Sequence, residues 1–240
     1  MSREKRKKVT ATEAADTLVN EAQESTAEEL ELRAGSEDEV ATVDTSKSAP
    51  ADREAEGPYD VSEVPVMRPY VDLGGIKVAP REGLQLRLEV DERANRVAAV
   101  SLDYEDSVLQ VQAFSAPKSS GLWGEVRTEL VQQMTAQGMA ASEEEGPLGP
   151  EVLVETPQPA EQGGGTRLVR FIAVDGPRWM LRGVIMGKAA DDAVARERVI
   201  DLFRELVVVR GDSPMPPSEL IPLRVPAGVK TDAPGEGQEA

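Results

Sequence analysis

The residues best placed to do chemistry stand together just before a predicted helix, at Lys118, Ser119 and Ser120. Backbone N–H groups at a helix N-terminus, joined by serine hydroxyls and a lysine, can hold a phosphate or a carboxylate. Serine is also a common residue at the start of a helix, where its hydroxyl caps the backbone, and we favour this structural role. The spacing matches neither the P-loop nor the dinucleotide-binding fingerprint. A Ser-Lys nucleophile is disfavoured because adjacent side chains usually point apart.

A second group of candidates lies in a predicted β-hairpin, where Arg170, Arg178 and Arg182 stand close to Trp179. With a two-residue turn, alternation places Arg170 on the face of Trp179 and the other two arginines on the opposite face. Such a face can stack on and hold an anionic partner. Arginine stems also cover apolar surface with their tips in water, and we favour this simpler role. The candidate contact surface is Lys118, Ser119, Ser120, Arg178 and Arg182, with no catalytic, cofactor-binding or metal-binding residue assigned.

The composition excludes several classes of chemistry. The 240 residues include no His and no Cys, and the formal net charge is −17. Ser-His-Asp triads, thiolate nucleophiles and His- or Cys-based metal sites are therefore excluded. Carboxylate chemistry, Ser-Lys nucleophiles and oxygen-bound Mg²⁺ or Ca²⁺ remain. The negative charge disfavours direct nucleic-acid binding, because it repels phosphate unless a local basic patch overrides it.

The sequence also predicts where the protein resides. Its basic start, residues 1–8, is not followed by the apolar core of a signal peptide. No stretch approaches the roughly 18 apolar residues of a membrane helix. We therefore expect a cytoplasmic protein without membrane insertion.

Both ends of the chain have the composition of disordered segments. Positions 11–60 contain 15 acidic residues against three basic ones, and their only aromatic residue is Tyr59. Such a segment buries too little apolar surface to offset its ordering entropy. We expect a disordered acidic tail over residues 1–60, with transient helical turns at 18–19 and 30–32 that a partner could order. A basic partner would suit this tail. Residues 227–240 are predicted to be a second disordered tail.

Residues 61–226 are predicted to form a single domain. Alternating or apolar runs predict strands over 76–78, 84–90, 97–104, 107–113 and 151–155, and a hairpin over 167–174 and 178–186 around Asp175-Gly176-Pro177. Helical spacing predicts helices over 121–137 and 191–207, and the acidic residues 142–147 are interpreted as a loop. Neighbouring strands tend to pair, which favours an α+β fold: a mostly antiparallel sheet with two helices packed on one face.

Four blocks of unusual sequence, at 68–75, 116–127, 175–183 and 202–217, resemble an uncharacterised family of conserved cytosolic actinobacterial proteins. The resemblance covers residues 61–226 and implies a domain of unknown function, often encoded near a dUTPase and an OB-fold protein. This setting implies nucleic-acid housekeeping and supplies no catalytic residue.

The residues and the resemblance together favour a non-catalytic protein-binding or assembly module. The alternative is an accessory regulator of nucleotide or nucleic-acid metabolism that acts through protein contacts. A hydrolase with a Ser-Lys or carboxylate site is the third interpretation.

Overall fold

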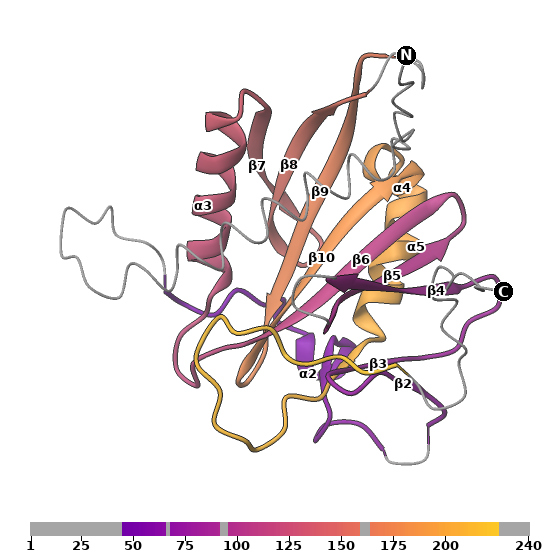
Figure 1. The fold of residues 1–240 in the computed structure, drawn as a ribbon, viewed down its shortest axis with the longest axis vertical. Coiled ribbons are helices and arrows are strands. Elements are labelled where there is room, and N and C mark those ends of the chain that lie inside the picture. Colours follow the sequence, from indigo (N-terminus) through magenta and orange to yellow (C-terminus); the bar gives the residue numbers. More distant parts are fainter. Residues whose placement is uncertain (1–44, 66–67, 92–95, 159–163, 226–240) are drawn as a thin grey trace, which may run out of the picture.

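The computed structural model describes residues 45–65, 68–91, 96–158 and 164–225. Its largest element is a seven-stranded antiparallel sheet in the order β4-β5-β6-β10-β9-β8-β7 (Figure 1). The strands are β4 (Gln85–Asp91), β5 (Arg96–Tyr104), β6 (Ser107–Ser115), β7 (Ala140–Gly146), β8 (Gly149–Pro157), β9 (Thr166–Asp175) and β10 (Trp179–Gly187). Two meanders, β4–β6 and β7–β10, join where β6 pairs with β10. The predicted α+β class with a mostly antiparallel sheet is confirmed.

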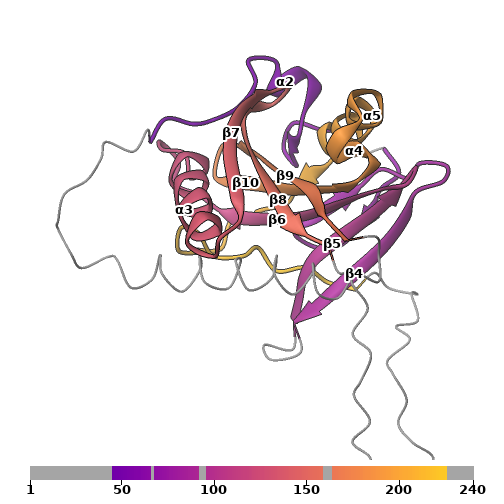
Figure 2. The ribbon, with the colours of Figure 1, turned by 90° about the horizontal axis from the view of Figure 1, so that it is seen from above.

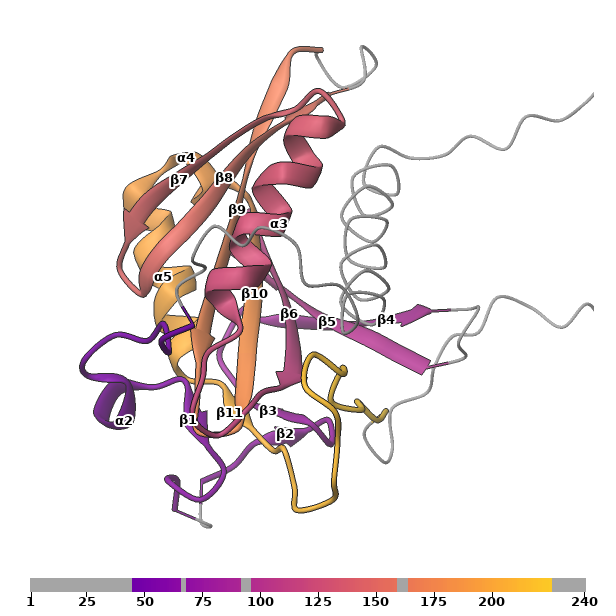
Figure 3. The same cartoon turned by 90° about the vertical axis from the view of Figure 1, so that its left-hand side faces the viewer.

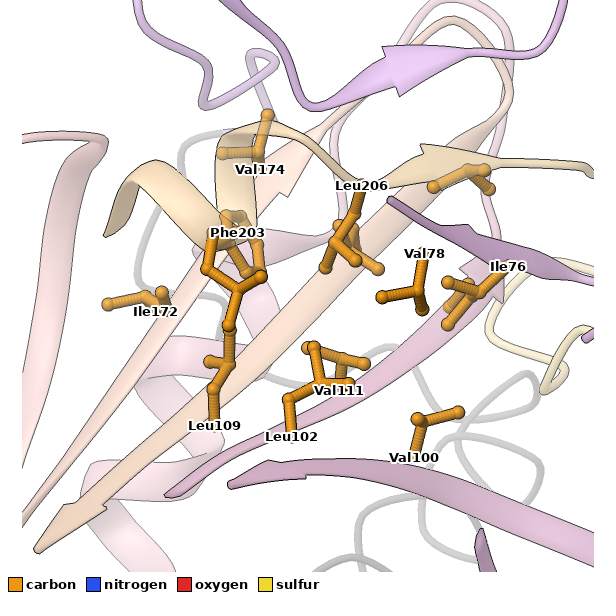
Figure 4. Packing of buried hydrophobic residues seen from close by; sticks show 14 of the residues in the cluster. Ile76, Val78, Val100, Leu102, Leu109, Val111, Ile172, Val174, Phe203 and Leu206 are labelled. Atoms are coloured by element: carbon orange, nitrogen blue, oxygen red, sulfur yellow. The ribbon is translucent and has the colours of Figure 1, made fainter. Parts of the chain in front are cut away.

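A second, four-stranded sheet lies at one end of the large sheet (Figure 3). Its order is β1 (Tyr59–Asp60), β11 (Val207–Val208), β3 (Ile76–Val78) and β2 (Val71–Asp72). Ile76 and Val78 of β3 meet Leu102 and Leu109 of the large sheet beside Phe203 (Figure 4). All five side chains are buried, so this cluster fastens the small sheet to the large one.

The helices lie on opposite faces of the large sheet (Figure 2). Helix α3 (Trp123–Ala136) packs on one face, whereas α4 (Lys188–Asp191) and α5 (Ala193–Arg204) pack on the other. The expectation that two helices share one face is therefore wrong in that detail. The reason is that β9 and β10 are buried along nearly their whole length, so each face needs its own cover.

The hairpin of β9 and β10 has a longer turn than predicted. Val174 pairs with Leu181 and Ile172 with Gly183, four positions from the predicted register. Side chains alternate with a period of two, so an even shift keeps every residue on its predicted face. Arg170 and Trp179 accordingly share the α5 face, and Arg182 lies on the α3 face.

The acidic residues interpreted as a loop form an edge strand instead. Strand β7 pairs with β8 from Ala140 to Gly146 and closes one side of the large sheet. Glu143, Glu144 and Glu145 are exposed along it. Charged side chains on an edge discourage the addition of another strand. The charge that suggested a loop is thus typical of a protected edge.

Residues 45–60 lie against the sheet, although the predicted tail included them. Thr45 O accepts from Gly121 N at 2.9 Å, and Asp175 N donates to Ser48 O at 2.8 Å. Arg53, in the short helix α2 (Arg53–Glu56), is buried with its guanidinium 5.9 Å from the ring centre of Trp179. Composition averaged over the whole tail concealed these few anchoring residues. The rest of both predicted tails, residues 1–44 and 227–240, lies outside the described residues.

Helix α5 is shorter than the predicted helix over 191–207. Asp192 caps it by accepting from Ala195 N at 2.8 Å, and residues 207–208 continue as β11. Ile200 and Phe203 face inward and are buried, whereas Val194 is 61% exposed. Val194 occupies the first turn, on the side of the helix that faces solvent.

Candidate functional site

A carboxylate of the same chain closes the N-terminus of α3. Asp175 accepts hydrogen bonds from Leu122 N at 3.0 Å, from Trp123 N at 3.4 Å and from Ser48 N at 3.0 Å. A Cβ at Gly121 would lie 2.5 Å from Asp175 Oδ2, so only glycine permits this approach. Burial raises the pKa of Asp175 above its ordinary value, against the opposing effect of these N–H donors. The place where a phosphate would bind is therefore already occupied.

The predicted contact residues Lys118, Ser119, Ser120 and Arg178 surround this cap. They lie in the loop before α3 and in the turn between β9 and β10, at the same end of the sheet (Figure 1). Ala116 N donates to Arg178 O at 3.0 Å and ties the two loops together. Lys118, Ser119 and Arg178 are exposed, and Ser120 is half-buried. We call these four residues the loop surface.

Neither serine caps α3, contrary to the predicted role. The N-cap position is Leu122, which makes no side-chain cap hydrogen bond, and Asp175 takes over the function from a distant part of the chain. Lys47 adds a third cationic side chain at this end, where it donates to Gly176 O and to Pro177 O, the latter at 2.8 Å. Partial burial lowers the pKa of Lys47, and the nearby Asp175 carboxylate opposes this shift. Sequence reasoning missed Asp175 because nothing local relates it to the helix.

Arg182, the fifth predicted contact residue, is not on the surface. It is 4% exposed on the α3 face, where it donates to Gln112 Oε1 and lies 5.2 Å from the ring centre of Phe114. Burial lowers its pKa to about 10. The expectation that Arg182 is exposed is wrong, because alternation predicts the face of a side chain but not what covers that face.

Arg182 is the end of a row of polar side chains that crosses four strands. Glu89 of β4 accepts from Ser101 of β5 and from Gln110 of β6. Gln112 of β6 donates to Ala98 O at 3.2 Å, beside its contact with Arg182 of β10. We call this set the polar row, and it comprises Arg87, Glu89, Ser101, Asp103, Gln110, Gln112 and Arg182. Its signal in the sequence is the polar half of the alternation in residues 84–90.

The opposite face holds a buried ion pair. Arg170 of β9 is 6% exposed and pairs with Glu151 of β8, which is 2% exposed. Its Nε donates to Ala190 O at 2.7 Å, and Glu144 of the edge strand lies 3.7 Å away. The guanidinium thus has both a counter-ion and a carbonyl acceptor within the fold. This arrangement stabilises the packing of β8 and β9 against α4.

Two features that the described residues lack bear on the remaining possibilities. Within them, no group of three or more Asp or Glu residues is arranged to hold a metal ion. No helix of the described ranges has the length and apolar character needed to cross a membrane.

The chain was compared with protein families, curated proteins and solved structures. Residues 57–232 match a family described as proteins of unknown function, DUF3710. No curated protein and no solved structure matches the chain. The match spans most of the chain, including both sheets, the Asp175 cap, the loop surface and the polar row. The protein therefore belongs to the DUF3710 family of proteins of unknown function.

Proposed function

We propose that this protein is a non-catalytic binding or assembly module that contacts a protein partner through the loop surface. The observation that carries the proposal is the exposure of Lys118 and Arg178 on two loops that the fold ties together. Within the described residues, neither side chain takes part in an ion pair. Their charges are therefore available to another molecule.

The loops are held on a rigid base, which favours a role in recognition. Trp123 and Trp179 are fully buried beneath them, and each indole N–H is hydrogen-bonded, to Pro150 O at 2.7 Å and to Asp60 at 2.9 Å. Asp175 fixes both loops from below. A surface that is ordered before binding loses less conformational entropy when a partner arrives.

The chemistry of the loop surface indicates an acidic partner surface. Lys118 and Arg178 are cations on a protein whose formal net charge is −17. A local positive spot on a negative protein orients an approaching partner that presents carboxylates there. The basic partner expected for the acidic tail would use residues outside the described part of the chain, so it is a separate proposal.

Charge reversal tests the loop surface. The double variant Lys118→Glu/Arg178→Glu in the full chain is expected to lose its co-purified partner from native host cells, as measured by affinity purification and mass spectrometry. Its melting temperature should stay unchanged, because both side chains are exposed. Lys188→Glu is the matched control, since Lys188 is exposed on the α5 face.

Two results would contradict this proposal. Retention of every partner by the double variant would remove the loop surface from the contact. Turnover of phosphatase, esterase or nuclease substrates that survives repurification would favour the hydrolase interpretation. A partner that acts in nucleotide or nucleic-acid metabolism would specify the module as a regulator of that metabolism.

The proposal includes a cytoplasmic location in an actinobacterial cell. Its support is the resemblance of the four sequence blocks to conserved cytosolic actinobacterial proteins. Cell fractionation with detection of the native protein tests the location, and recovery in the secreted fraction would contradict it.

A further inference from the structure

From β4 to β6, the polar row lies on a part of the sheet that no described helix covers (Figure 2). Helix α3 packs on the same face against β7, β8 and β9, and it reaches β10 at Met180 and Val184, on either side of Arg182. Gln110 and Ser101 in the middle of the row are nevertheless each 1% exposed. A glutamine that projects from a sheet face loses its contact with water only when something packs above it. The described C-terminal arm pairs edge to edge with β6 at residues 113–115, beyond the middle of the row. The burial therefore indicates a cover from outside the described residues.

Arg182 indicates what kind of cover fits, because Arg87 in the row is paired with Asp103 and Glu89 accepts from Ser101 and Gln110. Arg182 is buried and ionised at neutral pH, and its one described polar partner is the amide of Gln112. Within the described ranges no carboxylate forms an ion pair with it. A buried guanidinium favours an anionic counterpart, because an uncompensated charge in a low-dielectric site is costly. An acidic segment therefore suits this face better than an apolar or basic one.

The chain itself contains such a segment. The described part begins at Thr45, whose carbonyl accepts a hydrogen bond from Gly121 N just before α3. Helix α3 lies on the face that carries the row. Residues 1–44 precede this point, and residues 11–33 combine many carboxylates with Leu18, Leu30 and Leu32. Glu21, Glu24 and Glu28 have the spacing that places side chains on one side of a helix.

The length of this segment is sufficient. As a helix, residues 11–33 would extend about 34 Å at about 1.5 Å per residue. Four strands spaced about 4.8 Å apart span about 15 Å. Residues 34–44 could connect the segment to Thr45 over as much as about 36 Å. The other undescribed end, residues 226–240, is shorter and rich in Gly and Pro, without a leucine.

We propose that the acidic segment of residues 11–33 docks in cis on the polar row and places its carboxylates toward Arg182. The loop surface lies outside this contact, so the two proposals can fail separately. The segment would then act as a built-in cover for a polar sheet face. An acidic partner of the same chemistry would have to displace it.

The absence of cysteine makes the test clean, because introduced thiols are the only ones present. Spin labels at Gln85→Cys and at Ala15→Cys, Ala22→Cys or Thr26→Cys, one pair per protein, report the distance between the row and the segment in the full chain. Gln85 is exposed and lies on the face of the row, opposite Asp103. Lys188→Cys on the α5 face is the matched control.

We expect at least one pair with Gln85→Cys to give a short, narrow distance distribution, and longer distances from Lys188→Cys. Broad distributions from every pair would overturn the proposal. So would short distances that appear only between singly labelled chains, since the cover would then be a second copy. A narrow distribution from Gln85→Cys to Glu236→Cys, without one from the acidic segment, would assign the cover to the C-terminus and also overturn it.

Charge substitutions in the segment give a second, independent readout. The triple variant Glu21→Lys/Glu24→Lys/Glu28→Lys should broaden the Gln85→Cys distribution and speed amide hydrogen exchange in β5 and β6. The triple variant Glu37→Lys/Asp38→Lys/Glu39→Lys changes the net charge equally but lies outside the segment, and it should have neither effect. Equal effects of both variants would show that only the net charge matters, which contradicts docking.

Discussion

Each face of the large sheet buries one arginine, and the two arginines have different kinds of partner. On the α5 face, Arg170 is paired with Glu151 and bonded to Ala190 O. On the α3 face, Arg182 contacts the amide of Gln112 and the ring of Phe114. Both arginines are nearly fully buried. Arg170 therefore has a counter-ion within the described residues, whereas no described carboxylate forms an ion pair with Arg182.

The partners of a buried arginine determine whether it can still attract another group. A charge that is neutralised within the fold contributes to packing and leaves little for another molecule to bind. A charge whose described contacts are an amide and a ring retains attraction for an anion. Burial lowers the pKa of Arg182 to about 10, so the guanidinium remains protonated at neutral pH. The α3 face is thus the face on which a buried cation has no described counter-ion.

The largest effect on stability is expected when the buried ion pair of Arg170 and Glu151 is broken. Arg170→Met should lower the free energy of unfolding by about 3–5 kcal/mol, because Glu151 is left buried without a counter-ion. Chemical denaturation measures this change. The double variant Arg170→Met/Glu151→Leu should regain most of the stability, since no buried charge remains unpaired. A double variant less stable than the single one would contradict this account of the α5 face.

The cap of α3 comes next. Asp175→Ala should lower the free energy of unfolding by about 3 kcal/mol, because three backbone N–H groups lose their acceptor. Asp192→Ala is the control, since Asp192 caps α5 through one bond and should cost about 1 kcal/mol. Chemical denaturation of both variants tests this ranking. Equal losses in the free energy of unfolding would mean that Asp175 contributes no more than an ordinary helix cap.

The pH dependence of Asp175 has a defined sign. Burial raises its pKa, so the folded protein binds this proton more tightly than the unfolded chain. The contribution of Asp175 to stability should therefore grow as the pH falls from neutral toward an ordinary carboxylate pKa of about 4. Asp175→Asn lacks this titration, so the stability difference between the two proteins should shift in favour of the native chain. A shift in the other direction would mean that the N–H donors outweigh burial.

The smallest effect is expected at Arg182. Arg182→Met should change the free energy of unfolding by no more than about 1 kcal/mol, because removal of the charge also removes its desolvation cost. If a carboxylate from outside the sheets contacts Arg182, it can return to water when the arginine is removed. Glu151 cannot, because it is buried beside Arg170. Side-by-side denaturation with Arg170→Met sharpens the comparison. Equal losses in the two variants would mean that the two faces do not differ.

Most of the fold could be predicted because its elements are set by local patterns. The alternation in residues 84–90 and 97–104 and the apolar stripe of residues 122–134 correspond to β4, β5 and α3. Even the wrong hairpin register preserved the faces, since the error was an even number of residues. The helix faces could not be predicted, because two-sided burial of β9 and β10 depends on which strands flank them.

The candidate site was predicted only in part, for a similar reason. Lys118 and Arg178 are exposed in loops, which their polar surroundings in the sequence indicate, and their role in contact stays a prediction. The role of Asp175 depends on contacts with residues more than fifty positions away in the chain. The burial of Arg182 depends on what covers a polar sheet face. Such covers arise from tertiary structure, which a local pattern does not encode.

The outer edge of the sheet has a consequence for how this protein behaves in a crowded solution. Strand β7 presents Glu143, Glu144 and Glu145 to the surroundings, beside backbone groups that would otherwise accept another strand. Two such edges that approach each other bring like charges together before any ladder can form. Colloidal stability therefore depends on the ionisation of a few neighbouring side chains. Acid or concentrated salt weakens that repulsion and should therefore favour association of molecules edge to edge.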